Sequence, residues 1–148
     1  MMRKTILATT LLAAAVALPA LAAEDPIAQR QAIMKDNGKA IGTLAGMAKG
    51  QIPFDALAAE MAIRVMNASA NGFGALFPEG SETGGDTEAK PEIWSNRADF
   101  EVKLAEFRAA TEGAMSAPPA DLDGVKAALG ALGKTCGSCH ETYRVKKQ

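Results

Sequence analysis

Histidine, cysteine and aromatic residues are scarce in this 148-residue chain. It contains one histidine and two cysteines, so neither a site with several histidines nor a four-ligand Cys/His zinc site can form. The formal net charge of −1 lacks the basic excess that neutralises phosphates, and we expect no nucleic-acid partner. β-branched residues are also sparse while alanine is abundant, which favours helix over sheet. The length and composition suit a single globular domain.

The N-terminal segment has the pattern of a secretory signal peptide. A short cationic start is followed by an uncharged run from residue 6 to residue 21, and Ala20-Leu21-Ala22 fits a small-x-small cleavage site. A membrane anchor is the alternative, but the run is alanine-rich and shorter than the roughly 20 apolar residues of a spanning helix. We predict a cleaved signal peptide at 1–22, with cleavage after Ala22 or Ala23. The mature protein, 23–148, is then a periplasmic protein with no membrane span after cleavage.

The remaining chain shows four segments with helical spacing of apolar residues. Asp25-Pro26 is an N-cap followed by proline at the first helical position, and Pro118-Pro119 ends the third segment. The predicted helices cover 26–49, 53–72, 96–114 and the stretch from Asp121 or Asp123 to near the C-terminus, with a loop over 72–91. An all-α fold follows, and four amphipathic helices with mostly short connections predict an antiparallel, left-handed four-helix bundle.

Apolar stripes predict which helix faces are buried. In the second helix the predicted inward residues are Leu57, Met61, Val65 and Ala68. In the third helix they are Phe100, Leu104, Phe107 and Thr111. The loop residues Phe73, Leu76 and Phe77 are too apolar for a free linker, and we expect them to enter the core.

The chemically distinctive segment is Cys136-Gly137-Ser138-Cys139-His140, near the end of the last helix. This C-x-x-C-H spacing is the attachment pattern of c-type haem. Residues three apart on a helix share a face, so both thiols can join the vinyl groups of one porphyrin. The imidazole of the next residue can then reach the iron.

Three other interpretations of this segment exist. A thioredoxin-like redox pair needs a βαβ context, and no such pattern is visible in the sequence. A disulfide across two intervening residues is sterically poor within a regular helix. A lone histidine on an apolar face is commonly a packed core residue, but here the only histidine directly follows the second of only two cysteines. Covalent attachment of one haem c with its iron is the favoured interpretation.

The mature chain resembles the class II c-type cytochromes, that is, the cytochrome c prime family with its low-spin relatives. The matching segments span nearly the whole mature chain, and the C-terminal one is the most specific. They are Arg30-Gln31-x-x-Met34-Lys35, Lys49-Gly50-x-x-Pro53-Phe54-Asp55, Leu76-Phe77-Pro78-Glu79-Gly80, Pro91-x-Ile93-Trp94 and Gly133-Lys134-x-Cys136-x-x-Cys139-His140-Glu141-x-Tyr143-Arg144. The resemblance implies a four-helix bundle with covalently bound haem near the C-terminus.

The resemblance also implies roles for single residues. Cys136 and Cys139 are expected to form the thioethers, with His140 as an axial ligand. Arg30 corresponds to an arginine near a haem propionate, where a guanidinium suits a carboxylate, although a solvated helix residue is an equal alternative. Arg144, one turn beyond the histidine, is expected to shield the proximal face of the haem.

The ligand at the sixth coordination position of the iron is undecided, and Met34 is the candidate. In low-spin members of the family a methionine there binds iron, and the protein is a six-coordinate electron carrier. In cytochrome c prime proper an apolar residue there leaves a five-coordinate iron that admits nitric oxide or carbon monoxide. Some five-coordinate members also carry methionine, so the residue type leaves both possibilities open. We favour ligation by Met34 over the other methionines, whose positions do not match the distal site of the family.

The resulting functional hypothesis is a periplasmic electron carrier that exchanges electrons with redox partner proteins, with gas binding as the alternative. Lys134, Lys146 and Lys147 could steer an acidic partner. No spacing typical of a catalytic nucleophile and base is present, and we expect no enzymatic turnover. Relatives dimerise through their first two helices, and the homodimer face predicted here is the one carrying Ala58, Ala59, Ile63 and Met66.

Overall fold

The computed structural model describes residues 25–146. The predicted signal peptide at 1–22, both cleavage positions and Lys147 therefore lie outside the described residues. The described chain contains α1 (Pro26–Ala48), α2 (Ala56–Gly72), the 3-10 turn η1 (Phe73–Leu76), the short α3 (Glu92–Ser95), α4 (Arg97–Ser116) and α5 (Leu122–Tyr143).

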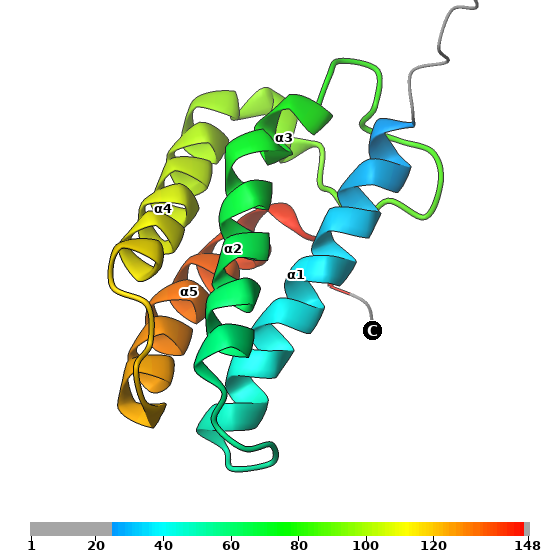
Figure 1. Cartoon of the computed structure of the whole chain (residues 1–148). Coiled ribbons are helices and arrows are strands. Elements are labelled where there is room, and N and C mark those ends of the chain that lie inside the picture. Colours follow the sequence, from blue (N-terminus) through cyan, green and yellow to red (C-terminus); the bar gives the residue numbers. More distant parts are fainter. Residues whose placement is uncertain (1–24, 147–148) are drawn as a thin grey trace, which may run out of the picture.

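The four long helices form the predicted antiparallel four-helix bundle (Figure 1). Helix α1 packs against α2 and α5, and α4 packs against the same two helices. First and last helices are therefore neighbours in space, which brings the C-terminal cysteines beside the N-terminal helix. Within residues 25–146, no helix is both long and apolar enough to cross a membrane.

Side-chain caps explain where three helices begin. The Asp25 carboxylate accepts a hydrogen bond from the Ile27 backbone N–H at 2.9 Å, as the Asp-Pro pattern predicts. Asp55 caps α2 in the same way. Of the two aspartates proposed for the last helix, it is Asp121 that caps it, accepting from the Gly124 N–H at 2.8 Å.

The predicted inward face of α2 is wrong. The side chains of Leu57, Met61 and Val65 are 67%, 51% and 40% exposed, and Ala68 is exposed as well. The buried residues of the helix are Ala59, Ala62, Ile63, Met66 and Ala70. Both stripes have helical spacing because α2 is apolar nearly all round, so periodicity could not choose between them.

The predicted dimer face fails for the same reason. Ala59, Ile63 and Met66 are at most 1% exposed and belong to the core, and Ala58 is partly buried against it. These residues cannot meet a second chain. The face of α2 that does meet solvent carries Leu57, Met61 and Val65 instead.

The interior consists of two apolar clusters. One joins α1, α2 and α5 through residues such as Leu44, Ile63 and Leu132. The other is largely aromatic: Phe73, Phe77, Phe100 and Tyr143 stack edge-to-face in sequence, with ring centroids 4.9–5.3 Å apart. The prediction that 73–77 enters the core is confirmed. The predicted stripe of α4 is buried at Phe100, Leu104 and Thr111, while Phe107 is partly buried.

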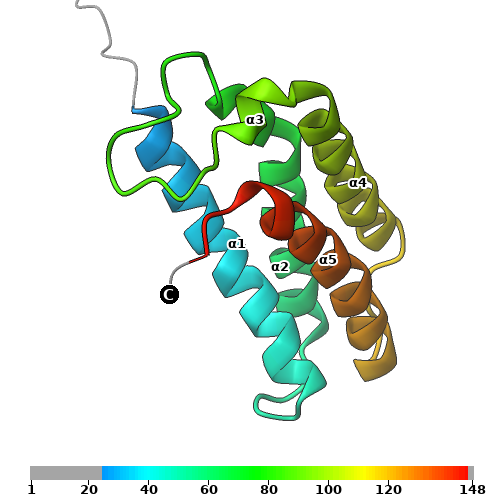
Figure 2. The same ribbon diagram turned by 180° about the vertical axis from the view of Figure 1, so that it is seen from behind.

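The long loop between η1 and α3 ends by pairing with the chain that follows α5. Ala89 forms an isolated antiparallel bridge with Arg144. The Lys90 N–H donates to the Tyr143 carbonyl at 2.9 Å, and the Val145 N–H donates to the Glu88 carbonyl at 2.8 Å. Figure 2 shows the chain after α5 turning toward α1 beside this loop. The pairing fixes the end of the helix that carries the cysteines.

Candidate functional site

A cavity of about 710 Å³ lies between α1, α4, α5 and the long loop, within the range of about 300–1,000 Å³ usual for ligand sites. Its lining contains every site residue predicted from the sequence. These are Arg30, Met34, Cys136, Cys139, His140 and Arg144. Residues more than 100 positions apart in the chain thus face one space, because α1 and α5 are adjacent in the bundle.

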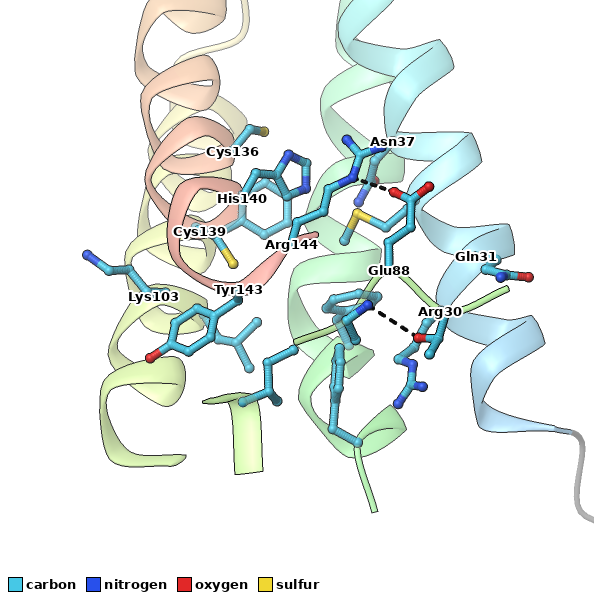
Figure 3. A pocket seen from close by; sticks show the side chains of 18 of the residues that line it. Arg30, Gln31, Asn37, Glu88, Lys103, Cys136, Cys139, His140, Tyr143 and Arg144 are labelled. Carbon is cyan, nitrogen blue, oxygen red and sulfur yellow. Dashed lines mark hydrogen bonds and ion pairs between the residues drawn. The ribbon is translucent and has the colours of Figure 1, made fainter. Parts of the chain in front are cut away.

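Helix α5 presents the two thiols and the imidazole to this cavity. Cys136, Cys139 and His140 are three and four residues apart within an unbroken helix, so they share one face. Both thiols are free and partly buried. Figure 3 shows Cys139 and His140 projecting from α5 toward α1. This is the arrangement that attachment of a single porphyrin requires.

Burial sets the protonation of these groups. It raises the pKa of the Cys136 thiol, and it raises the pKa of Cys139 to about 11. Both thiols are therefore neutral near pH 7, as inert buried cysteines are. Burial first, and then the charge of Arg144, lower the pKa of His140. The imidazole is neutral, which leaves a nitrogen lone pair free for a metal ion.

Helix α1 forms the opposite wall, and Met34 stands on it. Among the methionines of residues 25–146, Met34 alone lines the cavity, while Met47 and Met66 are buried in the first apolar cluster. One turn further along, a Cβ added at Gly38 would meet no atom within 4 Å. The wall around Met34 is therefore open toward the cavity rather than closed by a neighbouring helix.

Arg30 is a buried cation at the N-terminal end of this wall. Its side chain is 4% exposed and donates to the Leu76 carbonyl at 3.0 Å, the Ser81 hydroxyl at 3.0 Å and the Ser81 carbonyl at 2.8 Å. The guanidinium also lies 4.7 Å from the centre of the Phe77 ring. Burial lowers its pKa, and in the described part of the chain no carboxylate forms an ion pair with it. A solvated residue, the alternative from the sequence, is excluded.

Arg144 closes the cavity at the end of α5. Its Nε donates to a Glu88 carboxylate oxygen at 2.6 Å (Figure 3), and the side chain is 52% exposed. Glu88 lines the cavity but was not singled out from the sequence, because a glutamate in a polar loop carries no local signal. Lys35 and Lys103 also line it, whereas Lys134 and Lys146 are exposed outside the lining.

The residues present fit a haem. The cavity is mostly apolar, one wall offers paired thiols with an adjacent neutral imidazole, and the other offers a thioether. Within residues 25–146 the remaining buried charge is Arg30, which forms no ion pair there, and this suits a cofactor that carries carboxylates.

Comparison with known proteins agrees with this fit. A family model described as Cytochrome C' matches residues 25–144. The chain belongs to this family. Its cofactor is therefore covalently bound haem c with its iron, and the two C-terminal cysteines fit a C-x-x-C-H attachment.

The similar proteins include cytochromes c-556, c-554 and c'. A cytochrome c-556 from Agrobacterium tumefaciens is 43% identical over 82% of this chain and 98% of its own length. A cytochrome c' structure from Rhodopseudomonas palustris is 37% identical, with a TM-score of 0.80 over 85% of this chain and all of that one. A mutant of cytochrome c prime from Alcaligenes xylosoxidans, solved as a nitric oxide complex, is 34% identical, with a TM-score of 0.73 over 83% of this chain and 96% of that one. Membership of the family thus leaves the sixth position of the iron open.

Proposed function

We propose that the protein is a periplasmic electron carrier whose iron is held between His140 of α5 and Met34 of α1. The observation that carries this proposal is their position on opposite walls of one cavity, together with both cysteines. Cys136 and Cys139 would fix the porphyrin to α5 through thioether bonds. The haem supplies a one-electron couple between ferric and ferrous iron.

The fold favours electron transfer because both proposed ligands belong to long helices that pack against each other, Met34 within α1 and His140 in the last turn of α5. Such a frame keeps the ligands in place when the charge of the iron changes. Arg30 would balance a propionate of the haem, which is consistent with its burial without an ion pair among residues 25–146. Arg144 would shield the proximal side, held there by Glu88.

Exchange of electrons with periplasmic redox proteins would take place where the cavity meets the surface. Lys35 and Lys103 line the cavity, and Lys134 is exposed on α5. These cations suit a transient contact with an acidic partner over a small interface. The periplasmic location rests on the predicted signal peptide. It also agrees with the attachment of haem c, which takes place outside the cytoplasm.

The second candidate function is binding of nitric oxide or carbon monoxide at a vacant sixth position. The nitric oxide complex of the Alcaligenes relative favours it. This function requires that Met34 lies beside the iron without binding it, as apolar filler of the wall. The two candidates therefore differ in one bond, that between the Met34 sulfur and iron.

Absorption spectra of the purified haem protein in its ferric and ferrous forms test that bond. A low-spin spectrum with a sharp, resolved α band in the ferrous form is expected, and Met34→Ala should convert it to a broad high-spin spectrum. Met61→Ala is a matched control, because Met61 is half exposed and lies outside the cavity. A high-spin spectrum of the unaltered protein would refute ligation and support gas binding. A low-spin spectrum that persists in Met34→Ala would refute ligation by Met34, because another group would then occupy the sixth position.

We further propose that two copies associate through the solvent face of α2. Leu57, Met61 and Val65 form an exposed apolar stripe along this helix, and Ile52, just before it, is 41% exposed. A stripe of this kind suits an isologous contact with a second copy of the same helix. The resemblance implies dimerisation through the first two helices, so this stripe replaces the buried face predicted from the sequence.

A further inference from the structure

Asn37 is a buried polar residue of the cavity wall that the proposed function leaves unexplained. It lies on α1, three residues after Met34, and its side chain is 9% exposed. It lines the same cavity as the proposed axial ligands, and Figure 3 shows it on the α1 wall, across from His140. Each end of this carboxamide should have a hydrogen-bond partner, because buried polar groups are destabilising unless they are hydrogen-bonded.

One end of the carboxamide is held by α2. The single proton of the Ser69 hydroxyl has two acceptors within hydrogen-bond distance, the Asn37 Oδ1 atom at 2.9 Å and the Met66 carbonyl oxygen at 2.8 Å. In the structure the Oδ1 atom lies on the side of α2 and faces this hydroxyl. The Nδ2 group, at the other end of the planar amide, is then turned away from Ser69.

The Nδ2 group has no acceptor among residues 25–146. Among residues 25–146, Arg108 Nε is the one fully enclosed side-chain nitrogen or oxygen without a partner. The Nδ2 atom of Asn37 therefore keeps some accessible surface. Asn37 lines the cavity, so we place the accessible surface of its Nδ2 group there. An N–H donor at the wall of a ligand cavity points to an acceptor on the ligand side.

The position of Asn37 along α1 limits which atom can accept a hydrogen bond from its Nδ2 group. With a helical rise of about 1.5 Å per residue, Asn37 lies about 10 Å beyond Arg30 and about 5 Å beyond Met34. The three residues share one face of the helix, with Met34 between the other two. Arg30 therefore marks the propionate end of the site, and Asn37 reaches the opposite side of the iron position.

We propose that Asn37 is the hydrogen-bond donor of the distal side, with its Nδ2–H directed at the atom that occupies the sixth position of the iron. This rests on the proposed function, in which that atom is the sulfur of Met34. The positive end of the amide dipole destabilises ferric iron relative to ferrous iron. Asn37, positioned by Ser69, thus raises the reduction potential of the haem.

The carbon monoxide complex of the ferrous protein is the test, in a Met34→Ala background that empties the sixth position. A donor near the oxygen of carbon monoxide draws electron density onto it and lowers the C–O stretching frequency in the infrared spectrum. We expect a higher frequency in Met34→Ala/Asn37→Leu than in Met34→Ala, with a dissociation rate about two- to tenfold faster, as for loss of one hydrogen bond. Leucine keeps the approximate shape of asparagine without the donor.

Met34→Ala/Ser69→Ala is the second variant, which keeps the amide but removes its anchor. It should broaden the C–O band and shift it in the same direction. In the protein that keeps Met34, Asn37→Leu should lower the reduction potential measured by redox titration. Equal C–O frequencies with and without Asn37 would overturn the proposal. So would a shift to lower frequency in the leucine variant, because the amide oxygen would then face the cavity.

Failure of this proposal can be distinguished from failure of the proposed function. Ligation by Met34 is decided by the absorption spectrum of the unaltered protein. The carbon monoxide comparison is made where Met34 is absent, so it reports on Asn37 whether or not the thioether binds iron. A high-spin unaltered protein with a frequency shift would refute the electron carrier and support the donor.

Discussion

Replacement of Arg30 by methionine removes the best-connected buried cation of the site. Methionine keeps a flexible chain of similar length, so the loss is confined to the guanidinium. That group makes three hydrogen bonds to the segment 76–81 and lies over the Phe77 ring. It thereby joins α1 to η1 and the loop, which cover one end of the haem cavity.

The size of the effect follows from these contacts. A hydrogen bond contributes a net stabilisation of about 1 kcal/mol, and three give about 3 kcal/mol. Relief of guanidinium burial offsets part of this loss, while the Leu76 and Ser81 carbonyls left without a donor add to it. In a domain of this size, a loss of about 3 kcal/mol lowers the melting temperature by roughly 12 °C.

The assay is urea unfolding of the haem protein followed by far-UV circular dichroism. Arg97→Met is a matched control: Arg97 donates to the carbonyls of Gly74, in η1, and Phe77, directly after it, but its side chain is 40% exposed. We expect that control to lose about 1 kcal/mol, because exposed polar contacts compete with water. If Arg30→Met loses no more stability than Arg97→Met, burial does not strengthen the Arg30 contacts and the reasoning is wrong.

Three further outcomes are expected. Cys136→Ala combined with Cys139→Ala should leave haem extractable into acidified organic solvent, and haem retained by the polypeptide would contradict attachment at these thiols. Met61→Glu, a charge within the exposed stripe of α2, should convert dimers to monomers in sedimentation velocity, whereas an unchanged sedimentation coefficient would exclude that face. Burial and the hydrogen bond to Asp99 raise the pKa of Tyr143 to about 12, above its ordinary value of about 10. The stability that this contact contributes should be complete below about pH 10 and lost as the pH rises toward 12. The difference in free energy of unfolding between the protein and Tyr143→Phe, measured in urea, should therefore shrink over that range. A constant difference would contradict this expectation.

Much of the site could be predicted from the sequence because it depends on local spacing. The C-x-x-C-H segment needs only a regular helix to bring its three side chains to one face, and α5 is regular there. The helix bounds follow from caps and breakers such as Asp25-Pro26 and Pro118-Pro119, which act within a turn or two. The place of Met34 in the cavity followed from the family resemblance, which encodes the pairing of α1 with α5.

The remainder depends on contacts between distant segments. The buried face of α2 could not be predicted, because the side chains of Ala59 and Ile63 on the buried face are no larger than those of Leu57 and Met61 on the exposed face. Only the packing of α1 and α4 against α2 decides which stripe is covered. Glu88 and Ser69 had no signal of their own. Their importance comes from Arg144 and Asn37, which are 56 and 32 residues away along the chain.

Because α1 and α5 form opposite walls of the cavity, the cavity can form only late in synthesis of the chain. The wall bearing Met34 is made early in synthesis and the wall bearing the cysteines near the end, so no shorter N-terminal fragment possesses the pocket. Closing it joins the two ends of the chain, a long loop closure of the kind that slows folding. A chain that stops before residue 136 therefore contains α1, α2, α4 and only the first part of α5, and it lacks the cysteines and the histidine that complete the cavity.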